Sequence, residues 1–206
     1  MRTHGWSGAP PADDDEAMAR ILAATRVCLD RSGADTGLAD VARELGVTRQ
    51  TVYRYFKSTD QLLVATSIDA SAGFLERVEQ HLARRRGTPA ELVVEGLAFT
   101  LEQLPREPYL GLLLTPGRLS AFSQGVTSTT ALALGRAMIE RYPIDWSVHG
   151  FDDHALDELV EQTLRLTQSF VIDPGTPPRR GRALRDYLTR WLAPAVSAHG
   201  LSPRSV

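Results

Sequence analysis

Apolar side chains recur along the chain at the three- and four-residue spacing that gives an α-helix one buried face. The first such segment runs from about residue 13, where four consecutive acids suit a helix N-terminus, to residue 32. Two short segments follow at 38–45 and 48–56, and a long one begins at "STDQ", in which Ser58 and Gln61 have the spacing of a capping box. No run of alternating apolar and polar residues indicates a strand. The pattern therefore predicts an all-α chain.

The second half of the sequence is also helical in pattern, but its first part is less regular. Beyond "RRRGTP" at residues 84–89, an apolar region is interrupted by Pro105, Pro108, Gly111, Pro116 and Gly117. These interruptions predict short, kinked or irregularly packed helices. Two cleaner helices are predicted at about 152–172 and 182–198, joined by the loop "DPGTPP", and Pro194 should bend or end the last turn of the second.

Composition limits the kind of protein that this chain can be. Its 206 residues are 43% hydrophobic, so it can bury a substantial core. The single cysteine, Cys28, excludes an internal disulfide and favours a cytoplasmic protein. No apolar run approaches the roughly 20 residues of a membrane span and no signal peptide opens the chain, so no membrane partner is expected. The formal net charge of −2 does not indicate nucleic-acid binding, but the segment from Arg43 to Lys57 contains four basic residues and one acid.

The segment "ADVARELGVTRQTVYRYF", residues 39–56, predicts a helix-turn-helix, whose second helix enters the major groove of DNA. Gly46 permits the left-handed backbone of a tight turn, and Thr48 can cap the second helix. Arg49 and Gln50, in the first turn of that helix, suit bidentate contacts to guanine and adenine, whereas threonine and tyrosine hydroxyls suit phosphates. The candidate DNA-binding residues are Thr48, Arg49, Gln50, Thr51, Tyr53, Arg54, Tyr55 and Lys57. The alternative is a surface helix with ordinary solvated polar groups.

The longer stretch "GLADVARELGVTRQTVYRYFKSTDQLL" resembles the N-terminal DNA-binding domain of the tetracycline-repressor (TetR) family of bacterial transcription regulators. The elements most specific to the resemblance are the turn at residues 46–48, the "TVYRYF" signature at 51–56, and Leu62. The chain departs from the family at Thr59, where a lysine is usual at the start of the fourth helix. Lys57, the only lysine in the chain, could supply the same phosphate contact.

The resemblance implies a three-helix DNA-binding domain followed by a larger helical domain for ligand binding and dimerisation. We therefore expect a disordered arm, rich in glycine and proline, at residues 1–12, the DNA-binding domain at 13–58 and the ligand-binding and dimerisation domain at 59–206. The implied function is that of a repressor without cofactor or catalytic activity. It would bind a palindromic double-stranded DNA operator as a homodimer and be released by a small, largely apolar effector that displaces the fourth helix.

Candidate residues for these two further roles lie in the second domain. Large, mostly apolar side chains in the interrupted region and beside it are candidates for effector binding, namely Phe99, Tyr109, Phe122, Met138, Trp146 and Phe170. The last two predicted helices supply candidates for the dimer interface, namely Leu156, Leu159, Leu184, Tyr187, Leu188 and Trp191. The pattern alone is equally compatible with an intramolecular core at these positions.

Two other functions remain open at this point. His154 precedes Asp157 and Glu158 by three and four residues, which would place an imidazole and two carboxylates on one helix face, as metal ligands or an acid/base pair. The same residues also fit an acidic helix N-terminus with a solvated histidine. A helical adaptor that does not bind DNA is the other alternative. No HExxH motif, glycine-rich phosphate loop or nucleophile elbow supports an enzyme.

Overall fold

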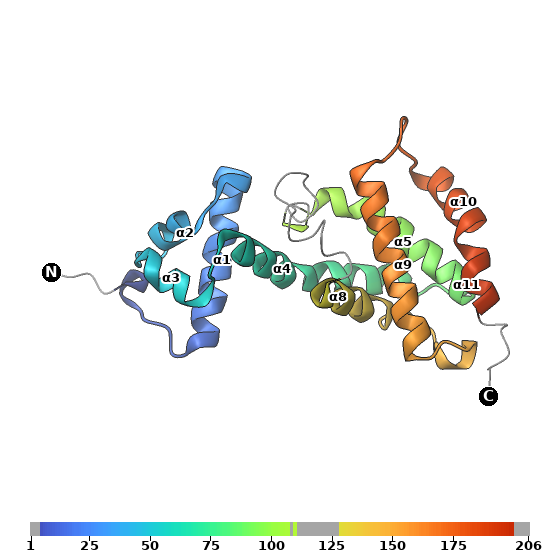
Figure 1. Ribbon diagram of the computed structural model, residues 1–206, viewed down its shortest axis with the longest axis horizontal. Coiled ribbons are helices and arrows are strands. Elements are labelled where there is room, and N and C mark those ends of the chain that lie inside the picture. Colours follow the sequence, from blue (N-terminus) through green and yellow to red (C-terminus); the bar gives the residue numbers. More distant parts are fainter. Residues whose placement is uncertain (1–4, 108, 111–127, 200–206) are drawn as a thin grey trace. The chain divides into compact units, whose positions relative to one another are not determined.

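The computed structural model of the chain describes residues 5–107, 109–110 and 128–199, and within these ranges every regular element is a helix (Figure 1). The all-α prediction is therefore confirmed. The α-helices are α1 (Asp14–Ser32), α2 (Leu38–Glu44), α3 (Arg49–Tyr55), α4 (Thr59–Leu82), α5 (Pro89–Gln103), α8 (Thr129–Ile139), α9 (Asp153–Ile172), α10 (Gly181–Trp191) and α11 (Ala193–His199).

The chain divides into two compact units, and the division lies inside α4. The described residues up to Ala72, together with Tyr109 and Leu110, form the first unit, and the remaining described residues form the second. Helix α4 therefore contributes to both. The domain boundary expected at residue 58 precedes this helix and stays a prediction.

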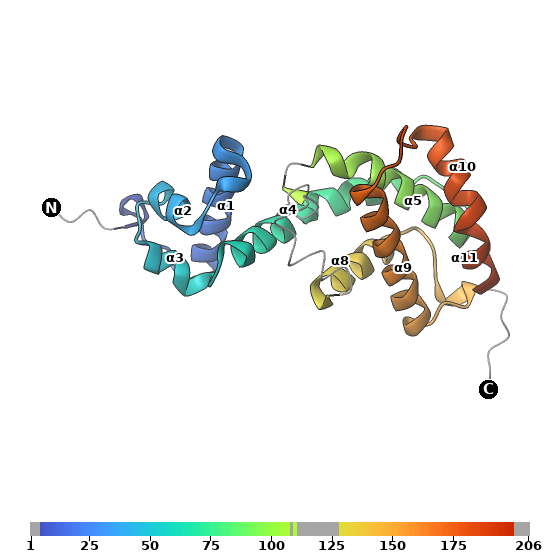
Figure 2. The ribbon, with the colours of Figure 1, turned by 45° about the horizontal axis from the view of Figure 1, so that its top comes forward.

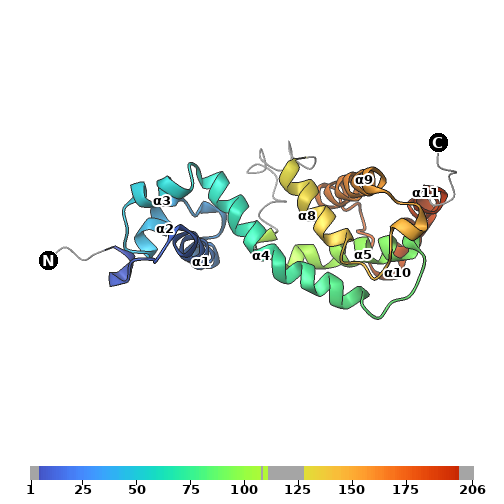
Figure 3. The same ribbon diagram turned by 90° about the horizontal axis from the view of Figure 1, so that it is seen from below.

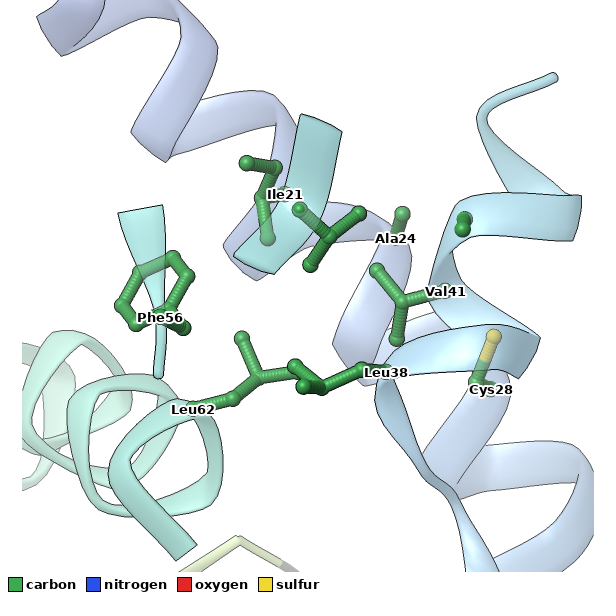
Figure 4. Close-up of a cluster of buried hydrophobic side chains, with 9 residues drawn as sticks. Ile21, Ala24, Cys28, Leu38, Val41, Phe56 and Leu62 are labelled. Atoms are coloured by element: carbon green, nitrogen blue, oxygen red, sulfur yellow. The ribbon is translucent and has the colours of Figure 1, made fainter. Parts of the chain in front are cut away.

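The first unit is built on α1, α2 and α3. Helix α1 starts where Asp13 accepts a hydrogen bond from the Glu16 N–H at 2.8 Å, and it ends at Gly33, whose φ is +59°. Helices α1 to α3 and the first turn of α4 enclose one apolar cluster (Figure 4). Its buried members are Ile21, Ala24, Cys28, Leu38, Val41, Ala42, Val52, Phe56 and Leu62. This cluster fixes how the two helices of the helix-turn-helix pack together.

Residues 5–12, which their composition assigns to a disordered arm, have a defined path in the structure. A 3-10 turn at Trp6–Gly8 places the half-buried indole of Trp6 against the apolar cluster. The Ala12 N–H donates to Glu16 Oε2 at 2.6 Å and so ties the segment to the first turn of α1. An apolar anchor and a helix-capping contact thus offset the low order that glycine and proline favour.

The second unit contains helices α5 and α8 to α11, with α10 packed along α5 and α8 along α9 (Figures 2 and 3). Helix α5 is one regular helix of 15 residues, so the prediction of short, kinked or irregular helices is wrong for this segment. The reason is the position of the prolines. Pro89 occupies the first turn, where its missing N–H is not needed, and Pro105 lies beyond the end of the helix. Thr88 and Glu91 form a capping box.

The C-terminal helical segment is interrupted at Leu192, between α10 and α11. Pro194 follows two residues later and has no N–H to continue the hydrogen-bond ladder of α10. The predicted end or bend of this helix at Pro194 is therefore confirmed. Among the described helices, none combines the length and the hydropathy needed to cross a bilayer.

A network of ion pairs joins α10 to α5. Arg185 on α10 donates to both carboxylate oxygens of Glu95 at 2.8 and 2.9 Å, and to Glu102 at 3.0 Å. His81 Nε2 lies 2.7 Å from Glu95 Oε1. Burial alone would raise the pKa of Glu95, but hydrogen bonds from Arg185 and His81 lower it to about 2. Glu95 therefore stays ionised and holds α10 against α5.

Candidate DNA-binding interface

The turn between α2 and α3 has the geometry of a helix-turn-helix. Gly46 has a φ of +65°, and the Val47 N–H donates to Ala42 O at 2.9 Å. Thr48 accepts a hydrogen bond from the Thr51 N–H at 3.1 Å, which confirms its predicted role as the cap of α3. A side chain at Gly46 would strain this backbone, so the glycine sets the direction in which α3 leaves the turn.

Helix α3 buries one face and exposes the other. Val52 and Phe56 are 0% and 5% exposed and belong to the apolar cluster. Gln50 lies on the opposite side of the 3.6-residue helical repeat, whereas Arg49, three residues before Val52, lies on the same side and is exposed because it is the first residue of α3. Arg49 and Gln50 lie exposed in the first turn, and in the described part of the chain neither has a hydrogen-bond or ion-pair partner. Their donor and acceptor groups are free to bind base edges.

The C-terminal turn of α3 is tied to the first turn of α1 through Asp14. Tyr55 donates its hydroxyl hydrogen to Asp14 Oδ1 at 2.8 Å, and Arg54 Nη2 donates to the same oxygen at 3.0 Å and also to the Tyr55 oxygen. Burial and the hydrogen bond to Asp14 raise the pKa of Tyr55, so its phenol stays protonated and remains a donor. Sequence reasoning missed Asp14, because 40 residues separate it from Arg54 and no motif connects them.

Lys57 lies just beyond the end of α3. Its Nζ donates to Arg54 O at 3.0 Å and lies 5.1 Å from the centroid of the Tyr53 ring, which is itself 47% exposed. Both side chains are therefore accessible beside Arg54. Ser58 accepts a hydrogen bond from the Gln61 N–H at 3.0 Å, as the capping pattern predicts, but Gln61 Oε1 accepts from the Lys57 N–H at 2.6 Å rather than from Ser58.

The effector candidates fall into separate surroundings. Phe99 stacks on His81 with centroids 4.1 Å apart, Trp146 is buried and donates to Ile139 O at 3.2 Å, and Phe170 meets Tyr187 edge-on at 5.8 Å. Met138 is half-buried and lies 3.8 Å from the Thr100 hydroxyl. Phe122 lies outside the described residues. None of these contacts tests effector binding, which stays a prediction for each of these residues.

Tyr109 belongs to the first unit, whereas the other effector candidates that the structure describes belong to the second. Its hydroxyl donates to the Asp30 carboxylate at the end of α1, 3.0 Å from Oδ1, and its backbone oxygen accepts from the Ser67 hydroxyl on α4 at 2.9 Å. The segment that follows α5 therefore returns to the DNA-binding unit and is held there by two helices.

The candidate interface residues differ in burial. Four leucines are already covered within one chain, namely Leu156, Leu159, Leu184 and Leu188. Tyr187 is half-buried, whereas Trp191 is 69% exposed at the end of α10. The intramolecular core that the pattern allowed therefore accounts for the leucines, and Trp191 is the member of the set with most surface left for a partner.

The helix face carrying His154 is not arranged as a metal or acid/base site. The His154 side chain is 83% exposed and its Nε2 lies 3.6 Å from Glu158, while Asp157 accepts a hydrogen bond from Arg136 at 2.8 Å. In the described ranges, no group of three or more histidine, cysteine, aspartate and glutamate side chains could hold a metal ion. Asp157 instead ties α9 to α8.

Comparison with known proteins finds one match to the N-terminal region and others over most of the chain. Residues 21–66 match the family model of the bacterial regulatory proteins of the tetR family. The chain is 27% identical over 197 residues to the HTH-type transcriptional regulator AlkX of Mycobacterium tuberculosis, covering 93% of this chain and 92% of that protein.

Two solved structures share the fold. The TetR family repressor AlkX from Dietzia sp. strain DQ12-45-1b has a TM-score of 0.62 at 20% identity, over 88% of this chain and 95% of its own. FadR of Thermus thermophilus, a TetR family transcriptional repressor, has a TM-score of 0.55 at 21% identity. The match covers 92% of this chain and 97% of the FadR chain. The helical arrangement described above is therefore shared along almost the full length of these chains.

Proposed function

Since the chain belongs to the tetR family of bacterial regulatory proteins, we propose that it is a ligand-responsive transcriptional repressor that binds a palindromic DNA operator as a homodimer. The observation that supports this most directly is the first turn of α3, where Arg49 and Gln50 are exposed, while Val52 in the next turn is buried and holds the helix in place. A capped turn and an apolar cluster fix that helix, which is the rigidity that base recognition requires.

We assign base reading to Arg49 and Gln50 and phosphate binding to the hydroxyls and cations around them. The residues proposed to bind phosphate lie along α3 and at its two ends, namely Thr48, Thr51, Tyr53, Arg54, Tyr55 and Lys57. Phosphate contacts position a protein on the duplex without reading its sequence, so these residues set affinity rather than specificity. A regulator that binds DNA in a bacterial cell acts in the cytoplasm, which is the location we propose for this protein.

The effector we propose is a small molecule with a large apolar part. Dietzia AlkX is implicated in the biodegradation of n-alkanes, and the Thermus FadR structure holds lauroyl-CoA, so two proteins of this fold are linked to molecules that contain a hydrocarbon chain. The effector would bind the second unit and stabilise a conformer in which α4, shared by both units, is displaced. Release of DNA follows only if the effector binds that conformer more tightly than the DNA-bound one.

Selection of bound sequences from a random double-stranded DNA library tests this function. We expect a palindromic consensus whose half-sites are about 10 base pairs apart, one helical turn, because each subunit of a symmetric dimer places its own α3 in the major groove. Enrichment of no sequence, together with no retardation of any duplex, would instead favour the helical adaptor. A single half-site without symmetry would contradict the dimer.

The role of Lys57 can be separated from that of the reading residues by salt dependence. Lys57→Ala should weaken operator and random DNA alike and flatten the plot of log affinity against log salt by about 0.9 per lost phosphate contact, or about 1.8 for two subunits. Adding Thr59→Lys should restore both, because it returns a cation to the position where the family carries one. An unchanged slope for Lys57→Ala, measured by fluorescence anisotropy across a salt series, would remove Lys57 from the DNA contacts.

Trp191 is the residue through which we test the dimer. Trp191→Asp should raise the dimer dissociation constant by at least about 30-fold, about 2 kcal/mol, because an aspartate would have to be buried where a large aromatic side chain was. Val148→Asp is the matched control, since Val148 is 76% exposed in the same unit but lies outside α9 and α10. Light scattering of both variants over a dilution series should give a dissociation constant at least about 30-fold higher for the first than for the second. Equal dissociation constants would exclude Trp191 from the interface.

A further inference from the structure

Asp14 interacts with two of the groups proposed to contact DNA. Its Oδ1 atom accepts hydrogen bonds from the Tyr55 hydroxyl at 2.8 Å and from Arg54 Nη2 at 3.0 Å. One cation and one neutral donor therefore converge on a single anionic oxygen. A DNA phosphate oxygen carries the same kind of charge and accepts the same hydrogen bonds.

We infer that Asp14 occupies, in the free protein, the anion site of Arg54 and Tyr55 that a DNA phosphate takes in the complex, so that its carboxylate lowers the affinity for DNA of any sequence. The inference rests on the proposed DNA contacts of these two residues. It assigns to α1 a role in DNA binding that the helix-turn-helix motif does not contain.

The exposure of the contact allows this exchange. The Asp14 side chain is 76% exposed and that of Arg54 is 67% exposed, so water and salt screen the ion pair and hold it only weakly. A phosphate that approaches α3 can therefore displace the carboxylate without unfolding any element. Asp13, not Asp14, is the residue whose side chain caps α1, so the helix does not depend on Asp14 for its start.

Competition of this kind changes affinity without changing specificity. Every duplex presents the same phosphates, so the carboxylate weakens operator and non-operator DNA by the same factor. Removing it should strengthen binding to both by about threefold per subunit, or about tenfold for a dimer, as expected for one exposed ion pair. The slope of log affinity against log salt should stay the same, because Arg54 neutralises the same phosphate with or without Asp14.

Asp14→Asn and Asp15→Asn form a matched pair for the experiment. Both remove one negative charge from the first turn of α1 and keep the side-chain shape, but in the described part of the chain Asp15 has no hydrogen-bond or ion-pair partner. We would measure the affinity of each variant for a random-sequence duplex and for the selected consensus duplex across a salt series. Asp14→Asn should gain about tenfold on both, and Asp15→Asn distinctly less.

The same comparison in an Arg54→Ala background isolates the contact itself. There the advantage of Asp14→Asn over Asp15→Asn should largely disappear, because the cation for which carboxylate and phosphate compete is gone. Equal gains for the two variants in the wild-type background would overturn the inference in favour of a general charge effect. A loss of affinity for Asp14→Asn would overturn it in favour of an orienting role.

A steeper salt slope for Asp14→Asn would also overturn the inference, because it would mean that the carboxylate keeps Arg54 from phosphate even in the wild-type complex. Failure of this inference is distinguishable from failure of the proposed function. Wild type and Asp15→Asn report DNA binding on their own, and if both bind while Asp14→Asn gains nothing further, only the role of Asp14 is lost.

Discussion

Gly96→Ala should lower the free energy of unfolding of the second unit by about 3 kcal/mol. A Cβ atom at this position would overlap the Tyr142 hydroxyl oxygen and lie 2.5 Å from the carbon that carries it, so the ring would have to move. Tyr142 is only 5% exposed and cannot swing into solvent. Helix α5 packs against α9, α10 and α11, so a shift of α5 would spread through the unit.

Gly73→Ala is the matched control, because Gly73 is also a helical glycine but its added Cβ would meet nothing closer than Arg77 Nη1 at 3.7 Å. Alanine should stabilise α4 there by up to about 1 kcal/mol through its higher helix propensity. Urea unfolding followed by circular dichroism would measure both changes. A Gly96→Ala protein as stable as wild type would mean that Tyr142 does not pack against α5 as described.

In the sequence, Gly96 is an interruption of the apolar run "LVVEGLAFTL" and nothing indicates its partner. The tyrosine that approaches it lies 46 residues later in a turn after α8. Close packing between distant segments leaves no periodic signal in the sequence. Of the two residues here, only Gly96 is unusual where it stands, as a glycine inside a helix. A glycine in a helix interior suggests that another segment packs closely against it, but only the structure identifies the residue that does so.

Local signals, in contrast, were sufficient for the helix-turn-helix. Gly46 and Thr48 act through their own backbone neighbours, and the buried positions Val52 and Phe56 follow from helical spacing within one short segment. The same reasoning could not separate Leu188 from Trp191. Both fit the apolar stripe of α10, yet the first is 1% exposed and the second 69% exposed. When an apolar stripe is wider than the face that one neighbouring helix covers, some of its residues are buried and others stay exposed. The periodicity of the stripe does not show which residues are which.

The sequence also did not predict the hydrogen bonds that join distant segments in the DNA-binding unit. Tyr109 fits the apolar character of the interrupted region, but its hydroxyl bonds to Asp30, 79 residues earlier in the chain. Asp14 fits an acidic helix start, and its contact with Tyr55 depends on the packing angle between α1 and α3. A polar side chain at a helix end fits the local capping rules whether or not it also has a distant partner. Its tertiary hydrogen-bond partners can therefore be identified only from the structure.

Arg49→Ala should weaken operator binding by about 1–3 kcal/mol in each half-site, and relax the base preference at one position per half-site. The expected size follows from the loss of a bidentate contact between the guanidinium and a guanine edge. Arg49 is free for that contact, because it lies exposed at the start of α3 and no ion pair in the described part of the chain holds it. On random DNA the same variant should lose only the small contribution of one cation.

Arg43→Ala provides the control that separates base reading from charge. Arg43 is an exposed cation of the same unit, but it lies on α2, where its guanidinium is 3.2 Å from Asp40. Its removal should weaken operator and random DNA by similar small factors, whereas Arg49→Ala should reduce the ratio of the two affinities. Repeating the random-library selection with the Arg49→Ala protein would identify the position that has lost its preference. If the ratio is the same for both variants and the consensus does not change, Arg49 binds phosphate, and base reading in the first turn of α3 falls to Gln50 alone.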